Sequence, residues 1–193
     1  MLIVREKGIV YLAESLGENV SDKNLKFSYR DITNPHNCSL FKFKLSKVIG
    51  GICTRESTLG HPYKTICNLR GELTIEKIVN EILPLIQETT DLIGWDPSEH
   101  DKEKHPFDHF VLARGDRVFK IHKGESVIEI EADCEAVGDD YLRKMVYDAS
   151  EMQGDAIDKI RNAYHEAERL FFTKSFPIAI IDTKSQKIRI YED

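Results

Sequence analysis

The 193-residue chain lacks several features that would place it in a class at once. It has no run of about 20 apolar residues, the length that a membrane-spanning helix needs. Arg5, Glu6 and Lys7 follow the first four residues directly, which is not the pattern of a secretory signal. There is no basic stripe interleaved with aromatic residues, and the formal net charge is −6, which argues against nucleic-acid binding. We therefore expect a cytoplasmic protein with neither a membrane nor a nucleic-acid partner.

Cysteine is also sparse. The four cysteines are scattered along the chain, at Cys38, Cys53, Cys67 and Cys134. A cytosolic chain of this size needs no disulfides, so reduced thiols are expected. Cys53 lies in an apolar segment, where a thiol is more often inert core than nucleophile. The Gly50-Gly51 pair lacks the lysine that follows in a phosphate-binding loop. No cofactor is predicted.

One polar segment gathers side chains of the types that bind metals. His100, His105 and His109 lie in it among several acidic residues. Their spacings of five and four fit no zinc signature, and Pro106 breaks any helix that would align the last two. A polar loop is the plain interpretation. A metal site with these three histidines as weak candidate ligands is the alternative.

Apolar residues make up 41% of the chain and often recur with period two, which indicates strands in a globular protein. The predicted strands are Leu2–Arg5, Ile9–Ala13, Leu25–Tyr29, Leu40–Leu45, Val48–Cys53, Phe110–Ala113, Val118–Ile121, Val127–Ala132, a short one ending at Val137, Pro177–Asp182 and Lys187–Tyr191. In the fourth of these, Lys42 and Lys44 are expected on a solvent-facing side. In Val48–Cys53 the glycines indicate close backbone packing.

Three segments show helical periodicity. Thr74 is a candidate N-cap for the first, and Pro84 should kink or end it. Its apolar stripe consists of Ile75, Ile78, Val79, Ile82, Leu83 and Ile86. Two further helices are predicted in succession over Asp140–Met152 and Asp155–Phe172.

This order of elements predicts an α+β fold. Short turns join neighbouring strands, so most pairings should be antiparallel, and the helices come in blocks. We predict a single domain over 1–193, built as a four-layer αββα sandwich of two mainly antiparallel sheets. The segments Leu2–Ala13, Phe110–Ile130 and Pro177–Ile181 should contribute to one core.

Four segments carry a resemblance to a known family. They are Leu2–Ser15 (LIVREKGIVYLAES), Lys47–Gly51 (KVIGG), Asp108–Gly138 and Pro177–Asp182. In this order they resemble the N-terminal nucleophile (Ntn) hydrolases of the proteasome β-subunit type. That family includes bacterial peptidase subunits that dock under an unfolding ATPase.

The resemblance implies a definite chemistry. In the family, a threonine, serine or cysteine at the mature amino terminus attacks an amide carbonyl, and the free α-amine serves as base. A nearby lysine lowers the pKa of that amine, an aspartate orients the group, and a glycine amide holds the oxyanion.

The residues at the start of this chain depart from that pattern. Met1 carries a thioether, which cannot act as the nucleophile, and Leu2 is too bulky for the usual removal of an initiator methionine. Internal self-cleavage would expose a nucleophile after glycine, but the chain has no Gly-Thr, Gly-Ser or Gly-Cys pair.

The supporting residues depart as well. The position of the family aspartate falls on Glu14, and the lysine position falls near Cys38–Leu40, which contains no lysine. Lys42 fits only if the register shifts. The serine-bearing turn reads Gly138-Asp139-Asp140. Glu14 and Lys42 are therefore weak catalytic candidates, with the nucleophile unknown.

These departures favour a catalytically degenerate, proteasome-like protein that acts in assembly or in binding a protein or peptide. The alternative is an active amidohydrolase or peptidase of the same fold with non-standard catalytic residues. A third interpretation is an unrelated α+β ligand-binding protein. Because proteins of the family work as rings, the resemblance also implies a homo-oligomer.

Overall fold

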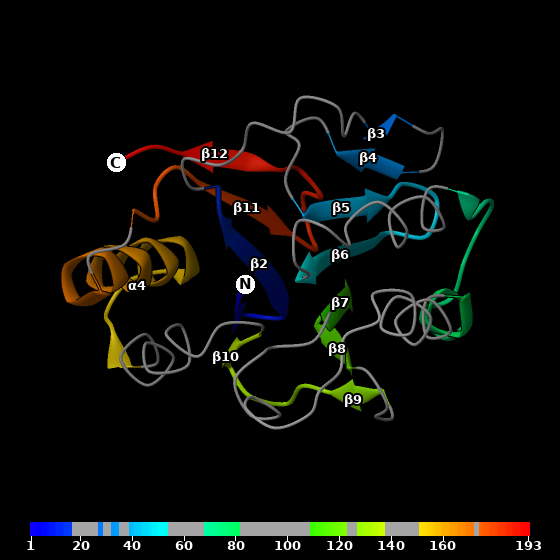
Figure 1. The fold of residues 1–193 in the computed structure, drawn as a ribbon. Helices are drawn as coiled ribbons and strands as arrows, with labels where there is room; N and C mark the ends of the chain where they lie inside the picture. Colours follow the sequence, from blue (N-terminus) through cyan, green and yellow to red (C-terminus); the bar gives the residue numbers. More distant parts are fainter. Residues whose placement is uncertain are drawn as a thin grey trace, which may run out of the picture.

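Two sheets and two helical layers are stacked on one another in this protein (Figure 1). The structure, a computed structural model, describes residues 1–16, 27–28, 32–34, 39–53, 68–81, 109–122, 127–137, 151–171 and 174–193. Within these residues, α4 lies on one side of the stacked sheets and the helical residues 75–81 lie on the other. None of the helices in the described part is long and apolar enough to cross a membrane.

Sheet A has five strands, and every pairing in it is antiparallel. In spatial order they are β10 (Cys134–Ala136), β1 (Leu2–Glu6), β2 (Ile9–Ser15), β11 (Ile178–Asp182) and β12 (Arg189–Tyr191). The turn between β1 and β2 uses Lys7 and Gly8, both at positive φ, as the Lys-Gly pair predicts.

Sheet B has seven strands, again paired antiparallel throughout. In spatial order they are β3 (Phe27–Ser28), β4 (Ile32–Asn34), β5 (Leu40–Phe43), β6 (Val48–Cys53), β7 (His109–Arg114), β8 (Arg117–His122) and β9 (Ile128–Glu129). Gly50 of β6 lies so close to its neighbours that an added Cβ would be 2.9 Å from the backbone oxygen of Val111. The glycine-bearing strand therefore packs closely, as predicted.

Apolar side chains from the facing sides of both sheets form the core between them. Its members include Ile3, Val10, Leu12, Leu40, Ile49, Val111, Ala113, Val118, Ile130, Ala179 and Ile181. The three segments Leu2–Ala13, Phe110–Ile130 and Pro177–Ile181 therefore share one core, as the sequence predicts.

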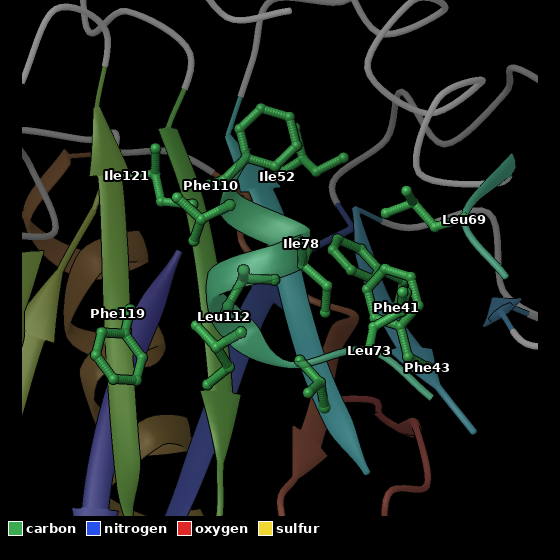
Figure 2. Packing of buried hydrophobic residues seen from close by; sticks show 13 residues of the cluster. Phe41, Phe43, Ile52, Leu69, Leu73, Ile78, Phe110, Leu112, Phe119 and Ile121 are labelled. Atoms are coloured by element: carbon green, nitrogen blue, oxygen red, sulfur yellow. The ribbon is translucent and has the colours of Figure 1, made fainter. Parts of the chain in front are cut away.

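Helices cover the outer faces of the sheets. On sheet A, α4 (Ala156–Phe171) buries Ile160, Ala163 and Tyr164, and the Tyr164 hydroxyl donates to the Ala13 carbonyl at 3.1 Å. On sheet B, the helical residues 75–81 bury Ile78 among apolar side chains of the strands, and Figure 2 shows this cluster. These layers confirm the predicted four-layer α+β sandwich.

The start of the helix on sheet B confirms its predicted N-cap. The Lys77 amide donates to Thr74 Oγ1 at 3.2 Å, which satisfies one of the free amides of the first turn. The Leu73 amide just before it donates to Ser46 Oγ at 2.7 Å. The helix is thereby tied to the turn between β5 and β6.

The prediction that the Lys42 side chain faces solvent is wrong. Lys42 does not lie on a solvent-facing side of β5, because it is half-buried and shares a strand face with Leu40, which faces sheet A. The opposite face carries Phe41 and Phe43, which pack in the cluster below the helix. Both faces of β5 are therefore covered, and of the two lysines only Lys44, beyond the end of the strand, is exposed.

The strand predicted over Val127–Ala132 is also shorter than expected. Only Ile128–Glu129 forms β9, and Val127 and Ile128 are 37% and 44% exposed. β9 is the last strand of sheet B, so the chain beyond it is free to leave the sheet, and β10 pairs with β1 of sheet A instead. Ile130 is buried, as its place in the pattern predicts.

Several predictions lie outside the described residues. They concern His100, His105, the kink at Pro84 and most of the helix expected over Asp140–Met152. His109 begins β7, and nothing is described of its side chain.

Truncating Ile78 tests the role of the helix on sheet B. Ile78 is fully buried in the cluster between this helix and sheet B. Ile78→Ala should therefore lower the free energy of unfolding by about 2–5 kcal/mol. Glu81→Ala, an exposed position on the same helix, should change it by less than about 0.5 kcal/mol. Urea denaturation measures both values, and equal effects would show that the helix does not pack on the sheet.

Candidate functional site

The amino terminus lies at one end of the sandwich, where its backbone is held by the residue after β10. The Met1 ammonium group donates to the Val137 carbonyl at 3.0 Å. In return, the Val137 amide donates to the Met1 carbonyl at 2.9 Å. These two bonds continue the pairing of β1 with β10, so the terminal residue has a fixed position.

The Met1 side chain is buried between the two sheets, with the residue 7% exposed. It lies against Gly51 of β6. A Cβ added to Gly51 would lie 2.0 Å from Met1 Cε, 2.7 Å from Met1 Sδ and 3.2 Å from Leu40 Cδ2. The thioether therefore occupies the space that a side chain at position 51 would need.

Glu14, near the end of β2, lies at the same end of the sandwich. Its Oε2 accepts a hydrogen bond from the Ser39 amide at 2.8 Å, and the Ser39 carbonyl accepts one from the Ile52 amide at 3.2 Å. The Ser39 hydroxyl lies beside the same carboxyl group but does not reach the geometry of a full hydrogen bond. Ser39 thus joins Glu14 of sheet A to β6 of sheet B.

Burial dominates the electrostatics of Glu14. It raises the pKa of the carboxyl group above its ordinary value, because it disfavours the charged form. Hydrogen bonding from Ser39 and the positive charge of the amino terminus act in the opposite direction. The net result is a raised pKa.

Lys42 lies elsewhere. Its Nζ donates to the Gln186 carbonyl at 2.7 Å, in the turn between β11 and β12. Burial, and then the charges of Lys44 and Lys187, lower the pKa of Lys42. Three residues of extended strand, about 10 Å, separate Lys42 from the Ser39 position. The structure therefore brings Glu14 together with Ser39 and the amino terminus, and not with Lys42.

The sequence did not single out Ser39 or Val137 as site residues. Counting back from KVIGG leads to Cys38–Leu40, so the position of Ser39 could be located. Its contact with Glu14 is made by a backbone amide, however, and Val137 contributes its carbonyl and amide. Backbone groups are present in every residue, so no residue type could have signalled either contact.

No group of three or more histidine, cysteine, aspartate or glutamate side chains in the described part of the chain could hold a metal ion. The candidate ligands His100 and His105 lie outside that part, so the metal site in the histidine-rich segment stays a prediction.

Neutralising Glu14 tests the electrostatics of this end. A carboxyl group whose pKa is raised on folding stabilises the fold at low pH, and this contribution is lost as pH rises through the raised value. Glu14→Gln keeps an acceptor for the Ser39 amide without the charge. The variant should therefore have a higher Tm than the wild type at pH 8, and the difference should shrink toward pH 5.

Thermal unfolding across this pH range measures the effect, with Glu72→Gln, at an exposed position, as the control without a shift in Tm. A Glu14→Gln variant that is less stable than the wild type at pH 8 would show instead that attraction to the amino terminus outweighs burial.

Comparison with known proteins extends this description. No protein-family model matches the chain, and no curated protein matches it. Among solved structures, Anbu (ancestral beta-subunit) from Yersinia bercovieri is 10% identical with a TM-score of 0.62, and the match covers 100% of this chain and 86% of that one. BPH from Thiobacillus denitrificans is 13% identical with a TM-score of 0.58, over 94% of this chain and 95% of the other.

A second structure of the Thiobacillus denitrificans protein, in complex with epoxomicin, matches with a TM-score of 0.56 at 13% identity, over 94% of this chain and 96% of that one. At these identities the likeness concerns the fold. Together with the two stacked antiparallel sheets and their helical layers, it shows that this chain has the fold of the proteasome-like Ntn hydrolases.

Proposed function

We propose that this protein keeps the proteasome-like scaffold without its amide-hydrolysing chemistry, and that it acts in assembly or in binding a protein or peptide. One observation carries the proposal. The residue at the head of β1 is Met1, and its thioether is packed between the sheets against Gly51. A thioether has no proton for a base to remove, so it cannot be activated as a hydroxyl or thiol is.

The direction of the next side chain supports the same proposal. Leu2 is fully buried on the other face of sheet A, in the cluster with Ile160 and Tyr164 of α4. The side chain that follows Met1 is therefore apolar and points away from Glu14 and Ser39.

The surroundings of Glu14 also support it. The group that contacts its carboxylate is the Ser39 amide, and the lysine nearest in sequence, Lys42, is bound to Gln186. The lysine that lowers the pKa of the terminal amine in the resembled family has no counterpart beside Glu14 among the described residues.

One observation favours the alternative of an active amidohydrolase. The Ser39 hydroxyl lies beside the Glu14 carboxyl group, and a hydroxyl next to a potential base is the minimal arrangement of an activated nucleophile. Ser39 is only 9% exposed, so a substrate would reach it only if the surrounding residues moved. The fold likeness speaks against the third interpretation, an unrelated ligand-binding protein.

A labelling experiment separates the two candidates. The protein should neither cleave small fluorogenic peptides nor gain mass when incubated with epoxomicin, because Met1 offers no nucleophile. Intact-mass spectrometry provides the measurement, and BPH from Thiobacillus denitrificans, which has been solved in complex with this compound, serves as the positive control.

An adduct on any residue would contradict the proposal of a degenerate site. An adduct mapped to Ser39, and lost in Ser39→Ala, would establish the active alternative.

The proposed role in assembly concerns a second property. Leu170, near the end of α4, is 45% exposed and stands next to the half-buried Phe171, which provides apolar surface for a neighbouring copy. We expect light scattering at micromolar concentration to show a particle heavier than the 22.2 kDa monomer. Leu170→Asp should reduce its mass, whereas Asn162→Asp, at an exposed position of the same helix, should not. A 22.2 kDa particle at all concentrations would rule out the homo-oligomer.

A further inference from the structure

Four hairpin turns lie together at the end of the sandwich opposite Met1. They comprise residues 7–8, 44–47, 115–116 and 183–187. Thr183 holds three of them in contact, since its hydroxyl donates to the Gly115 carbonyl at 2.6 Å and accepts from the Val10 amide, beside the first turn, at 3.1 Å. The bond from Lys42 to Gln186 brings the remaining turn to the same place.

This end of the molecule is basic, although the chain as a whole has a net charge of −6. The exposed basic residues in or next to the four turns are Lys7, Lys44, Lys47, Arg114, Arg117, Lys184 and Lys187, of which Arg117 is paired with Glu129. Asp116 is the one acidic residue within the turns themselves. Two acidic residues flank the turns: the Asp182 carboxylate accepts hydrogen bonds from the amides of Lys184 and Ser185, and Glu6 Oε2 accepts one from the Ala156 amide.

The pKa of the half-buried Lys42 depends on the charges around it. After burial, the groups that act on its pKa are Lys44 and Lys187, and both lower it. No acidic group contributes among the residues the structure describes. Positive charge therefore predominates around Lys42, between Lys44 and Lys187.

An exposed apolar side chain lies among these basic residues. Leu45, between Lys44 and Lys47, is 58% exposed, more than any other large hydrophobic residue in the described ranges. The turn that carries it is firmly placed, since Ser46 is buried and bonded to the Leu73 amide. An exposed leucine on a rigid turn, flanked by lysines, can anchor an apolar side chain of a partner.

We infer that Lys44, Leu45, Lys47 and Lys187, here called the basic tip, form a docking site for a short acidic segment of a partner protein. Its carboxylates pair with the lysines, and one of its apolar side chains packs on Leu45.

The choice of a short peptide segment over an extended anion follows from charge and composition. A net charge of −6 repels a nucleic acid or an anionic membrane that extends beyond the tip, whereas a short segment contacts the tip alone. The four turns contain no aromatic side chain on which a base could stack. The basic tip lies at the far end from the amino-terminal site, so this inference does not depend on whether that site is inert.

A fluorescein-labelled hexapeptide of alternating glutamate and leucine tests the inference by fluorescence anisotropy. The wild-type protein should bind it, and more weakly as the salt concentration rises from roughly 0.05 M to about 0.5 M, because exposed charge pairs are screened. The double variant Lys44→Glu/Lys187→Glu should lose affinity by about tenfold or more, and Leu45→Ser by several-fold. Lys174→Glu reverses one charge at an exposed position outside the tip and should bind like the wild type.

Circular dichroism confirms that each variant is folded before it is titrated. Absence of binding to the wild type, or equal loss in Lys174→Glu and the double variant, would overturn the inference. So would tighter binding to phosphatidylserine vesicles or to an oligothymidine strand through the same lysines, since either would identify a different class of partner. Cleavage of the peptide would bear on the proposed function and not on the docking site.

Discussion

The packing of the Met1 side chain against Gly51 joins the two sheets at the amino-terminal end. Met1 precedes β1 of sheet A, and Gly51 belongs to β6 of sheet B. Because position 51 has no Cβ, the thioether can lie directly on the β6 backbone. Gly50, on the opposite face of the same strand, gives the same freedom to the Phe41 ring and the Val111 carbonyl. The glycine pair thus allows one strand to be covered closely on both sides.

The two ends of the sandwich differ in character. At the amino-terminal end, an apolar side chain fills the space between the sheets, and the burial of Glu14 next to the Ser39 amide raises the pKa of its carboxyl group. At the other end, the hairpin turns carry exposed lysines around Leu45, and Lys42 is held by Gln186. Among the described residues, the charged groups that meet at the amino-terminal end are Glu14 and the terminal amine, while the opposite end presents several lysines to solvent.

Much of the fold could be predicted from the sequence, because alternation and helical stripes are local patterns. The hairpin of β1 and β2, the buried β11 and the N-cap at Thr74 all follow from such patterns. The departure of β10 to sheet A could not be predicted, because pairing between distant strands leaves no local signal.

The candidate site was predictable only in part, for a related reason. The position of Glu14 follows from its place at the end of a strand, but its partner is the amide of Ser39, which any residue would supply. The face of β5 that carries Lys42 is covered by the other sheet. A period-two pattern shows that a strand has two faces, but not that a second sheet covers one of them. The histidine-rich segment remains a sequence prediction.

The packing of Met1 can be measured directly by nuclear magnetic resonance on protein labelled with ¹³C at its three methionine methyl groups. If the thioether fills the space beside Gly51, its methyl protons will show strong nuclear Overhauser effects to the Gly51 α-protons and the Leu40 methyl groups. The Met1 signal will also be shielded from a soluble paramagnetic agent. A sharp Met1 signal that the agent broadens, without contacts to Gly51, would contradict the account, because the space between the sheets would then be open to another occupant.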